Sequence, residues 1–302
     1  MKLWIPDGDG RDAIGQLPEG VALSVTPREG ELPAEMLEAE FLVPRAGDRR
    51  IVEMLPRMRV LRVIQTLSAG VDRLVGIVPG GVVLCDAGGT RDVAVAEWVL
   101  AAILASTRSL GELRDRQREH VWRWCRSREL AGATVMILGY GAIGAAVEAR
   151  LRPFDVSLIR VARTAREGVH AVGELEALLP GAEVLVVLVP LTSETVGLLD
   201  RRMLDLLPQD ALLVNAARGR VLDGEALLAL AQAGRVRAVL DVTDPEPLPA
   251  EHPLWDAPGV LITPHFAGDT AAADRRAFAF AGEQVRRYVR GEKLSNVVEH
   301  GY

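Results

Sequence analysis

Cysteine and lysine are scarce in this chain of 302 residues. The two cysteines, Cys85 and Cys125, are too few for a disulfide framework and lack the spacing of a metal site, so we expect no bound metal. Lys2 and Lys293 are the only lysines, so 33 of the 35 basic residues (35 minus 2) are arginine. Arginine in place of lysine throughout the chain is typical of a bias in genome composition. By itself it does not indicate a binding site.

Long apolar runs and an excess of positive charge are missing as well. No stretch approaches about 18 uninterrupted apolar residues, and the opening MKLWIPDGDG has no long apolar core, so we expect neither a membrane span nor a secretory signal. The net charge of -6 argues against a nucleic-acid partner. Hydrophobic residues make up 49% and charged residues 25%, which is a globular balance. These features predict a soluble cytoplasmic protein that binds neither nucleic acid nor a membrane.

Short apolar runs alternate with helix-compatible stretches and with turns rich in proline and glycine. A first series predicts strands at 3–5, 21–25, 41–44, 60–66 and 82–85. A second series predicts strands at 134–139, 156–162, 184–190, 211–217, 236–242 and 260–265. The second series consists mostly of continuous apolar runs, as expected of strands buried on both faces. The pattern predicts an α/β fold built on parallel sheets.

Three helices are predicted with some detail. Residues 92–117 have apolar positions at helical spacing and are long enough to link two domains. The stretch 223–235 predicts a helix with Asp223 at its N-cap and Gly234 at its C-cap. A last helix is expected over 271–290.

A glycine-rich loop follows the first strand of the second series. Gly139, Gly141 and Gly144 have G-x-G-x-x-G spacing, with a strand before them and a helix after them. Such glycines permit a tight turn, close approach to a pyrophosphate and close helix–strand packing, while the helix N-terminus offers N–H groups to the phosphates. A tight turn without a ligand would need the same glycines. We predict a dinucleotide site formed by Gly139, Tyr140, Gly141, Ala142, Ile143 and Gly144.

The acid that usually follows the next strand is missing. An Asp or Glu about 20 residues on would hold the adenosine ribose, but Ala162 stands there. Arg163, Thr164 and Arg166 follow it, and guanidinium groups can pair with a 2′-phosphate. In an arginine-rich chain they could also be solvated loop residues. We predict a preference for NADP(H), with NAD(H) also possible.

Polar residues follow three later strands. Arg218 comes after the strand at 211–217, Asp241 and Glu246 come at and after the end of the next one, and His265 ends the last. Ligands collect at the carboxyl ends of strands in an open α/β sheet. There the arginine would bind a substrate carboxylate, the imidazole would exchange a proton with a substrate oxygen, and the carboxylate would hold the imidazolium. This set fits hydride transfer at a 2-hydroxy or 2-oxo acid.

The sequence resembles the D-isomer-specific 2-hydroxyacid dehydrogenases over most of its length, most strongly from residue 90 to 270. The matching pieces are SAGVD at 68–72, VAEWVL at 95–100, ELAGATVMILGYGAIG at 129–144, VPLTSETVGLL at 189–199, LLVNAARGRVLD at 212–223, LDVTDPEPLP at 240–249, HPLW at 252–255 and TPHFAG at 263–268. Their order and spacing make coincidence an unsatisfactory explanation.

The resemblance implies roles for individual residues. Arg218 matches the family's substrate-binding arginine, Glu246 its carboxylate, and His265 its acid/base, which also lies beside the nicotinamide. Backbone amides of Ala69, Gly70 and Val71 would hold the substrate carboxylate. The positions that would line the cofactor are Pro190, Thr195, Ala216 and Asp241, the last near the carboxamide.

The resemblance also implies an architecture of two Rossmann-like, doubly wound parallel-sheet domains. The substrate domain, flavodoxin-like, would comprise 1–92 and 272–302, and the NAD(P)-binding Rossmann domain, 93–271, would be inserted in it. Members of the family form twofold dimers, so we expect a homodimer. Trp122 and Trp124 are expected near a domain or dimer junction, with substrate contact as the alternative.

The activity that these features favour is NADPH-dependent reduction of a small 2-oxo acid to the D-2-hydroxy acid. The Ala-Arg-Thr sequence resembles the glyoxylate and hydroxypyruvate reductases that use NADPH. One alternative is an NAD-dependent D-2-hydroxyacid dehydrogenase, for example acting on phosphoglycerate. Another is a corepressor-like protein that senses a dinucleotide without catalysis. Formate oxidation is disfavoured, because such relatives place Gln where Glu246 stands.

Overall fold

The computed structural model describes residues 1–6 and 10–299. The chain divides into two compact units, which we describe separately. The outer unit comprises Met1–Arg91 and Asp269–Tyr302, and the inner unit comprises Asp92–Gly268. Lys2 and Lys293 both belong to the outer unit.

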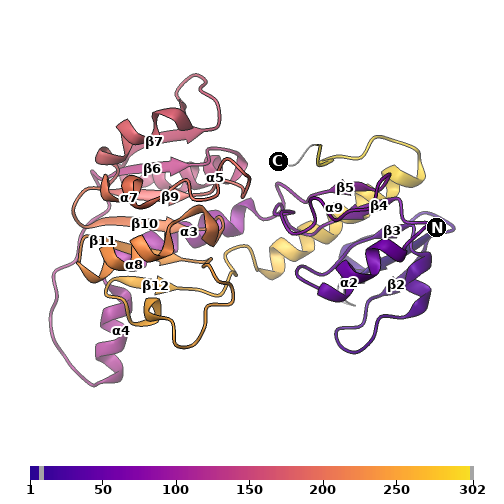
Figure 1. The fold of residues 1–302 in the computed structure, drawn as a ribbon, viewed down its shortest axis with the longest axis horizontal. Helices are drawn as coiled ribbons and strands as arrows, with labels where there is room; N and C mark the ends of the chain where they lie inside the picture. Colours follow the sequence, from indigo (N-terminus) through magenta and orange to yellow (C-terminus); the bar gives the residue numbers. More distant parts are fainter. Residues whose placement is uncertain (7–9, 300–302) are drawn as a thin grey trace. The chain divides into compact units, whose positions relative to one another are not determined.

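The inner unit is built on a parallel sheet (Figure 1). Its strands are β6 (Thr134–Leu138), β7 (Ser157–Ala162), β8 (His170–Ala171), β9 (Val184–Val187), β10 (Ala211–Asn215), β11 (Val236–Leu240) and β12 (Val260–Ile262). They are ordered β12-β11-β10-β9-β6-β7-β8. The chain runs outward from β6 in one direction and resumes on its other side at β9. The loops after β6 and β9 therefore flank the point where the strand order reverses, which is where ligands bind in such sheets.

Helices cover both faces of this sheet. They are α3 (Asp92–Thr107), α4 (Leu110–Arg118), α5 (Ala142–Leu151), α6 (Leu175–Leu178), α7 (Arg201–Asp205) and α8 (Gly224–Gln232). Short 3-10 turns lie at Arg152–Phe154, Val172–Glu174, Leu179–Gly181, Gly219–Val221 and Pro253–Asp256. Asp223 caps α8, since its side chain accepts a hydrogen bond from the Ala226 N–H at 2.9 Å, and Gly234 follows the C-cap with φ +65°.

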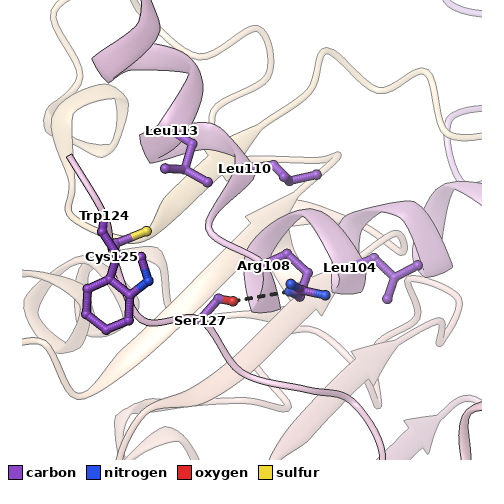
Figure 2. A pocket seen from close by; sticks show the side chains of 7 residues that line it. All are labelled: Leu104, Arg108, Leu110, Leu113, Trp124, Cys125 and Ser127. Carbon is purple, nitrogen blue, oxygen red and sulfur yellow. Dashed lines mark hydrogen bonds between the residues drawn. The ribbon is translucent and has the colours of Figure 1, made fainter. Parts of the chain in front are cut away.

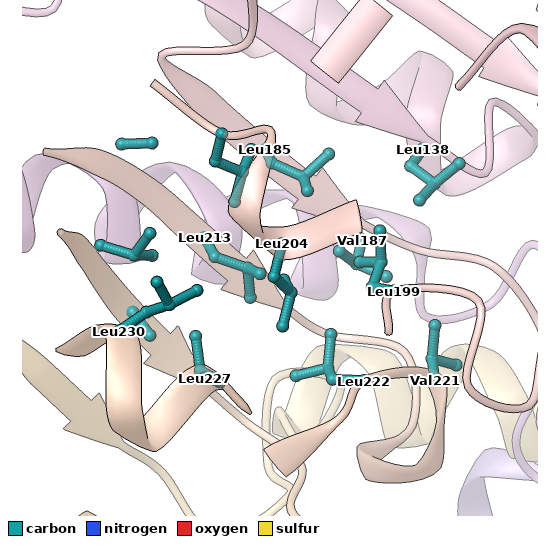
Figure 3. Packing of buried hydrophobic residues seen from close by; sticks show 14 of the residues in the cluster. Leu138, Leu185, Val187, Leu199, Leu204, Leu213, Val221, Leu222, Leu227 and Leu230 are labelled. Atoms are coloured by element: carbon teal, nitrogen blue, oxygen red, sulfur yellow. The ribbon is translucent and has the colours of Figure 1, made fainter. Parts of the chain in front are cut away.

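Alternate strand residues sort into two apolar cores, one on each face of the sheet. In β6, Val135 and Ile137 face the core shared with α3 and α5, whereas Met136 and Leu138 face the other. Figure 3 shows part of that second core, where strand residues from β6, β9 and β10 meet leucines of α7 and α8. Burial on both faces explains why these strands are continuously apolar.

The outer unit has a smaller parallel sheet ordered β2-β1-β3-β4-β5, the order of flavodoxin-like folds. Its strands are β1 (Lys2–Ile5), β2 (Ala22–Val25), β3 (Phe41–Leu42), β4 (Val63–Gln65) and β5 (Val83–Cys85). Its helices are α1 (Gly10–Ala13), α2 (Arg49–Met54) and α9 (Ala271–Val289), with 3-10 turns at Ala34–Glu38 and Leu55–Arg57. α9, yellow in Figure 1, packs Phe278, Ala281 and Val285 against the sheet, so the end of the chain completes a unit that its beginning started.

The fold class and all eleven expected strands are confirmed, as is the last helix. The two-residue strand β8 was not predicted. The single helix expected over 92–117 is wrong: α3 and α4 are separate and bent by 65°, because Ser109 adopts a left-handed conformation with φ +52°. A left-handed residue cannot continue a right-handed helix.

None of the individual helices in the described ranges combines the length and apolar character needed to cross a bilayer. The bent pair α3 and α4 passes that test only when taken together, on length and composition.

Candidate active site

Three neighbouring strands of the inner unit carry the predicted catalytic residues in the loops at their carboxyl ends. Arg218 follows β10, Glu246 follows β11 and His265 follows β12. His265 Nδ1 lies 2.9 Å from Glu246 Oε1, with the imidazole 41% and the carboxyl 27% exposed. An ionised carboxylate only accepts hydrogen bonds, so Nδ1–H donates and Nε2 is left for a substrate oxygen. This is the arrangement of an oriented acid/base.

The backbone at His265 is left-handed, with φ +52°, and a buried acid holds it there. The Asp241 carbonyl accepts a hydrogen bond from the His265 N–H at 2.7 Å. The Asp241 carboxylate accepts bonds from the Phe266 and Ala267 N–H groups, both at 2.9 Å, and from the Thr263 hydroxyl at 2.6 Å. The turn that carries His265 is therefore wrapped around Asp241, which is 3% exposed. Asp241 thus positions the turn of His265, and its predicted contact with the cofactor stays a prediction.

The loops that carry Arg218 and Glu246 are in close contact. The Arg218 carbonyl accepts a hydrogen bond from Asn215 Nδ2 at 3.1 Å, and Arg218 Nη1 donates to the Ala217 carbonyl at 2.7 Å. A Cβ on Gly219 would lie 2.1 Å from the backbone carbon and oxygen of Thr243. Only glycine allows this approach, so residue 219 sets the separation of the loops after β10 and β11.

The glycine loop passes from β6 into α5. Gly139 has φ +102°, and a Cβ there would lie 2.6 Å from the Leu188 carbon and the Val189 nitrogen, so the loop packs directly against the segment after β9. A Cβ on Gly144 would lie 3.1 Å from the Gly139 carbonyl oxygen. At Gly141 a Cβ would meet nothing within 4 Å, so the space beside it is open. Glycines that pack the loop tightly and leave one side open fit a dinucleotide pyrophosphate at the N-terminus of α5.

The other predicted cofactor residues border the same edge of the sheet. The loop after β9 folds back through Thr195, whose hydroxyl donates to the Pro190 carbonyl at 2.5 Å and accepts a bond from the Thr192 N–H at 2.8 Å. Ala216 follows β10, and its N–H donates to the Val187 carbonyl at 3.2 Å. These contacts hold the loops around the reversal point in fixed shapes.

The end of β7 is where a cofactor's ribose would be selected. Ala162 is half-buried, and Arg163, Thr164 and Arg166 after it are exposed. Arg163 Nε lies 3.7 Å from Glu194 Oε2, and Arg166 Nη2 donates to the Tyr140 carbonyl at 2.6 Å. The two arginines therefore have different neighbours, and Arg166 is bonded to the glycine loop.

Sequence reasoning missed a buried acid beneath the glycine loop. The Glu148 carboxylate, in α5, accepts bonds from the Tyr140 hydroxyl at 2.6 Å and from the guanidinium groups of Arg152 and Arg160. Hydrogen bonds from Arg160 are the largest cause of the low pKa of Glu148, which falls from 4.5 to about 2. Burial acts in the opposite direction, and bonds from Tyr140 and Arg152 lower the pKa further. The available signal was a charged residue between Val147 and Leu151 on the inward face of a helix.

The predicted substrate loop belongs to the outer unit. It follows β4, and the Thr66 hydroxyl donates to the Ser68 carbonyl at 2.7 Å. The side chain of Val71 is buried, while Ala69 and Gly70 are half-buried. The buried Val71 side chain anchors the loop, and the substrate-binding role of these residues stays a prediction.

The strand order and the glycine loop together define a dinucleotide-binding α/β unit. The chain belongs to the D-isomer specific 2-hydroxyacid dehydrogenase family, because residues 100–267 match the model of that family's NAD binding domain. The predicted resemblance is thus confirmed.

Relatives of this chain carry different named activities. A glyoxylate reductase of Thermofilum pendens is 32% identical over 88% of this chain and 83% of its own length. A D-3-phosphoglycerate dehydrogenase of Methanocaldococcus jannaschii is 30% identical over 99% of this chain, which spans 59% of the relative's length. A D-isomer specific 2-hydroxyacid dehydrogenase from Xanthobacter autotrophicus Py2, solved with NADPH and MES, superposes with a TM-score of 0.82 at 31% identity, covering 99% of this chain and 97% of its own.

Proposed function

We propose that the protein reduces a small 2-oxo acid, of the glyoxylate or hydroxypyruvate kind, to the D-2-hydroxy acid with NADPH. The observation that carries the proposal is the hydrogen bond between His265 Nδ1 and Glu246 Oε1, 2.9 Å long, at the strand edge that also carries Arg218. An imidazole oriented by a carboxylate, with an arginine at the same edge of the sheet, matches what reduction of a 2-oxo acid requires.

His265 acts as the general acid in this proposal. Its Nε2 gives a proton to the substrate oxygen as the carbonyl becomes an alcohol, and Glu246 stabilises the imidazolium before the transfer. Asp241 keeps the imidazole in place through the turn at residues 265–267. In the reverse reaction the same nitrogen accepts the proton.

Arg218 binds the substrate carboxylate and stabilises charge that develops on the carbonyl oxygen. The role predicted for the backbone amides of Ala69, Gly70 and Val71, in the outer unit, stays a prediction from the sequence. Contacts to the carboxylate and the carbonyl together select 2-oxo acids over simple ketones or aldehydes.

The cofactor, when bound, supplies the hydride. The glycine loop from Gly139 to Gly144 would hold its pyrophosphate, and the loops with Pro190, Thr195 and Ala216 would flank it. The absence of an acid at Ala162 and the arginines after it favour a 2′-phosphate over a free hydroxyl. The relative solved with NADPH is consistent with this preference.

Initial rates with NADPH and NADH over a panel of 2-oxo acids test the proposal. The panel contains glyoxylate, hydroxypyruvate, pyruvate and phenylpyruvate. We expect a lower KM for NADPH than for NADH. We expect the highest kcat/KM with glyoxylate or hydroxypyruvate. Equal use of NADH would contradict the cofactor assignment, and no turnover despite cofactor binding would contradict the reaction.

The acid/base role is tested by H265N with H120N as its matched control. Both histidines are exposed and left-handed, with φ +52° and +56°, and asparagine tolerates that conformation. We expect H265N to lose about a thousandfold in kcat while cofactor affinity stays within about twofold. H120N should behave as the wild type. Survival of most turnover in H265N would refute the assignment.

A second candidate is oxidation of a phosphorylated D-2-hydroxy acid with NAD. It is favoured by the M. jannaschii relative, which matches nearly the whole of this chain. Adding 3-phosphohydroxypyruvate to the panel separates the two: preference for it together with NADH would select this candidate.

The same chain is proposed to form a homodimer through the surface around α4. Leu110 is 54%, Trp124 is 77% and Trp122 fully exposed, although apolar side chains of this size usually find cover. Figure 2 shows a hollow between α3, α4 and the following segment, lined by Leu104, Arg108, Leu110, Leu113, Trp124, Cys125 and Ser127. A second copy of this surface would bury these groups.

Light scattering of the wild type and of W122S/W124S tests the dimer. We expect twice the chain mass for the wild type and a shift toward the monomer for the double variant, whose unfolding should otherwise be unchanged. A monomeric wild type at micromolar concentration would contradict the proposal.

A further inference from the structure

The contacts around the glycine loop assign a role to the residue between its first two glycines. We propose that Tyr140 is a positioning residue that holds the Arg166 guanidinium at the ribose end of the cofactor site, and so sets how strongly a 2′-phosphate is preferred. The inference rests on the NADPH preference proposed above and names the side chain through which that preference is built.

Tyr140 contacts Arg166 in two ways. The Tyr140 carbonyl accepts a hydrogen bond from Arg166 Nη2 at 2.6 Å, and the Arg166 guanidinium carbon lies 5.7 Å from the centre of the Tyr140 ring. A guanidinium over an aromatic face is held by the ring's electrons as well as by the hydrogen bond. The hydrogen bond uses one of the five N–H groups of the guanidinium, so a phosphate can take others.

The backbone of Arg166 is also fixed. Its N–H donates to the Val169 carbonyl at 3.0 Å, and the Val169 N–H donates to the Arg166 carbonyl at 2.8 Å. Gly168, with φ +68°, permits the tight turn between them. Arg166 is therefore held at both its backbone and its guanidinium, which lowers the entropy lost when a phosphate binds.

Tyr140 is itself anchored from below. Its hydroxyl donates to Glu148, a side chain that is 3% exposed, and the guanidinium carbon of Arg160 lies 5.8 Å from the centre of its ring. Arg160 is paired with Glu148 through bonds of 2.5 and 2.7 Å. The ring thus joins the cluster around the buried Glu148 carboxylate to an exposed cation.

Arg163 is less suited to the same task. Its Nε lies 3.7 Å from Glu194, and both side chains are more than half exposed. Within the described residues, Arg166 takes part in none of the ion pairs, so its charge is not balanced by an acid. A dianionic phosphate is best matched by the unbalanced cation.

The test compares two probes that differ only in the 2′-phosphate: adenosine 2′,5′-bisphosphate and adenosine 5′-monophosphate. Their affinities for the full chain are measured by titration calorimetry, which does not depend on turnover. For the wild type we expect the bisphosphate to bind at least about tenfold more tightly, as a charge-assisted phosphate contact would give.

Three single variants and one double variant separate the contributions. Y140L should lose about tenfold in bisphosphate affinity with monophosphate affinity within about twofold, whereas Y140F, which keeps the ring, should retain most of the preference. R166Q should lose the preference as well. The double variant Y140L/R166Q should lose no more than R166Q alone, because both changes remove one interaction.

Each outcome decides between the proposals. A wild type without preference for the bisphosphate overturns the NADPH assignment and this inference with it. A wild type with the preference, together with a Y140L that keeps it, overturns this inference alone. Equal loss of both probes in Y140L and in Y140F would also overturn it, since that pattern means only a damaged loop.

Discussion

The loops after β10, β11 and β12 hold their polar side chains through buried backbone contacts, whereas the loop after β7 holds its arginines through contacts close to the surface. In the first group of loops, Asp241 is buried and its carboxylate binds the turn that carries His265. In the loop after β7, Arg166 is exposed and its guanidinium is held by Tyr140. Groups that react require a fixed geometry, whereas groups that select a ligand must remain accessible to it. We therefore expect substitutions in the loops after β10, β11 and β12 to impair turnover strongly. Substitutions in the loop after β7 should change cofactor affinity alone.

Among the variants that test this comparison, D241N, in the loop after β11, is expected to have the largest effect on turnover, although a smaller one than H265N. An amide at position 241 would set an NH₂ group or a weaker acceptor against the Phe266 and Ala267 N–H groups, so His265 would shift. We expect kcat to fall about a hundredfold, as a displacement of about 1 Å can cause, with cofactor affinity within about twofold. D256N, at an exposed aspartate, serves as the control. Loss of cofactor affinity with kcat retained would mean that Asp241 contacts the cofactor instead.

A single added methyl group, at Gly219, should disturb the contact between the loops after β10 and β11. In G219A the new Cβ would lie 2.1 Å from the Thr243 backbone, which cannot move away as a flexible side chain would. We expect the free energy of unfolding to fall by about 3 kcal/mol. G224A is the matched control, because a Cβ there would meet nothing within 4 Å. Urea unfolding of the two variants measures the difference, and equal stabilities would show that the loops separate easily.

The cluster around Glu148, beneath the glycine loop, should make the free energy of unfolding depend on pH. The pKa of Glu148 is about 2 in the folded chain against an ordinary 4.5, because Arg160 above all stabilises the carboxylate. This stabilisation is complete above about pH 4.5 and disappears as the pH falls through about 2, and the shift corresponds to at most about 3 kcal/mol.

The variant that tests this dependence is E148Q, with E176Q as an exposed control. We expect E148Q to unfold about 2 kcal/mol more easily at pH 7, since the amide keeps part of the hydrogen bonding, and the difference from the wild type should shrink between pH 4.5 and 3. E176Q should be near the wild type throughout. A difference that is independent of pH would show that the charge of Glu148 is not what stabilises the loop.

The smallest effect is expected from R163Q, which sharpens the comparison within the loop after β7. Because Arg163 is paired loosely with Glu194, its loss should weaken bisphosphate binding by less than about threefold, against about tenfold for R166Q. E194Q removes the pairing acid and should leave affinity equal or slightly better. A larger loss in R163Q than in R166Q would transfer the phosphate contact to Arg163.

Much of the fold could be predicted because its signals are local and repeated. Continuous apolar runs identified the strands, and Asp223 identified the start of α8. Strand β8 has only His170 and Ala171, too few residues for a pattern. The break before α4 depends on a left-handed serine at position 109, and serine gives no sequence signal for that conformation.

Some features of the candidate site could likewise be predicted from the sequence, and others could not. His265 and Glu246 belong to short segments with a recognisable order, and the hydrogen bond between them lies where parallel strands end. The packing of Gly219 against Thr243 joins two loops whose contact the sequence does not record. The cluster around Glu148 gathers Tyr140 and Arg160 from different elements through side chains, and no pairwise spacing announces it.

The placement of the two lysines has a practical consequence for handling the protein. Among the side chains, amine-directed reagents would attach to Lys2 and Lys293, both in the outer unit, and would leave those of the inner unit from Asp92 to Gly268 unmodified. A fluorophore or surface tether introduced in this way sits apart from the glycine loop and the His265 turn in the chain. Nucleotide affinities measured on such immobilised protein would therefore report on an inner unit whose side chains are all native.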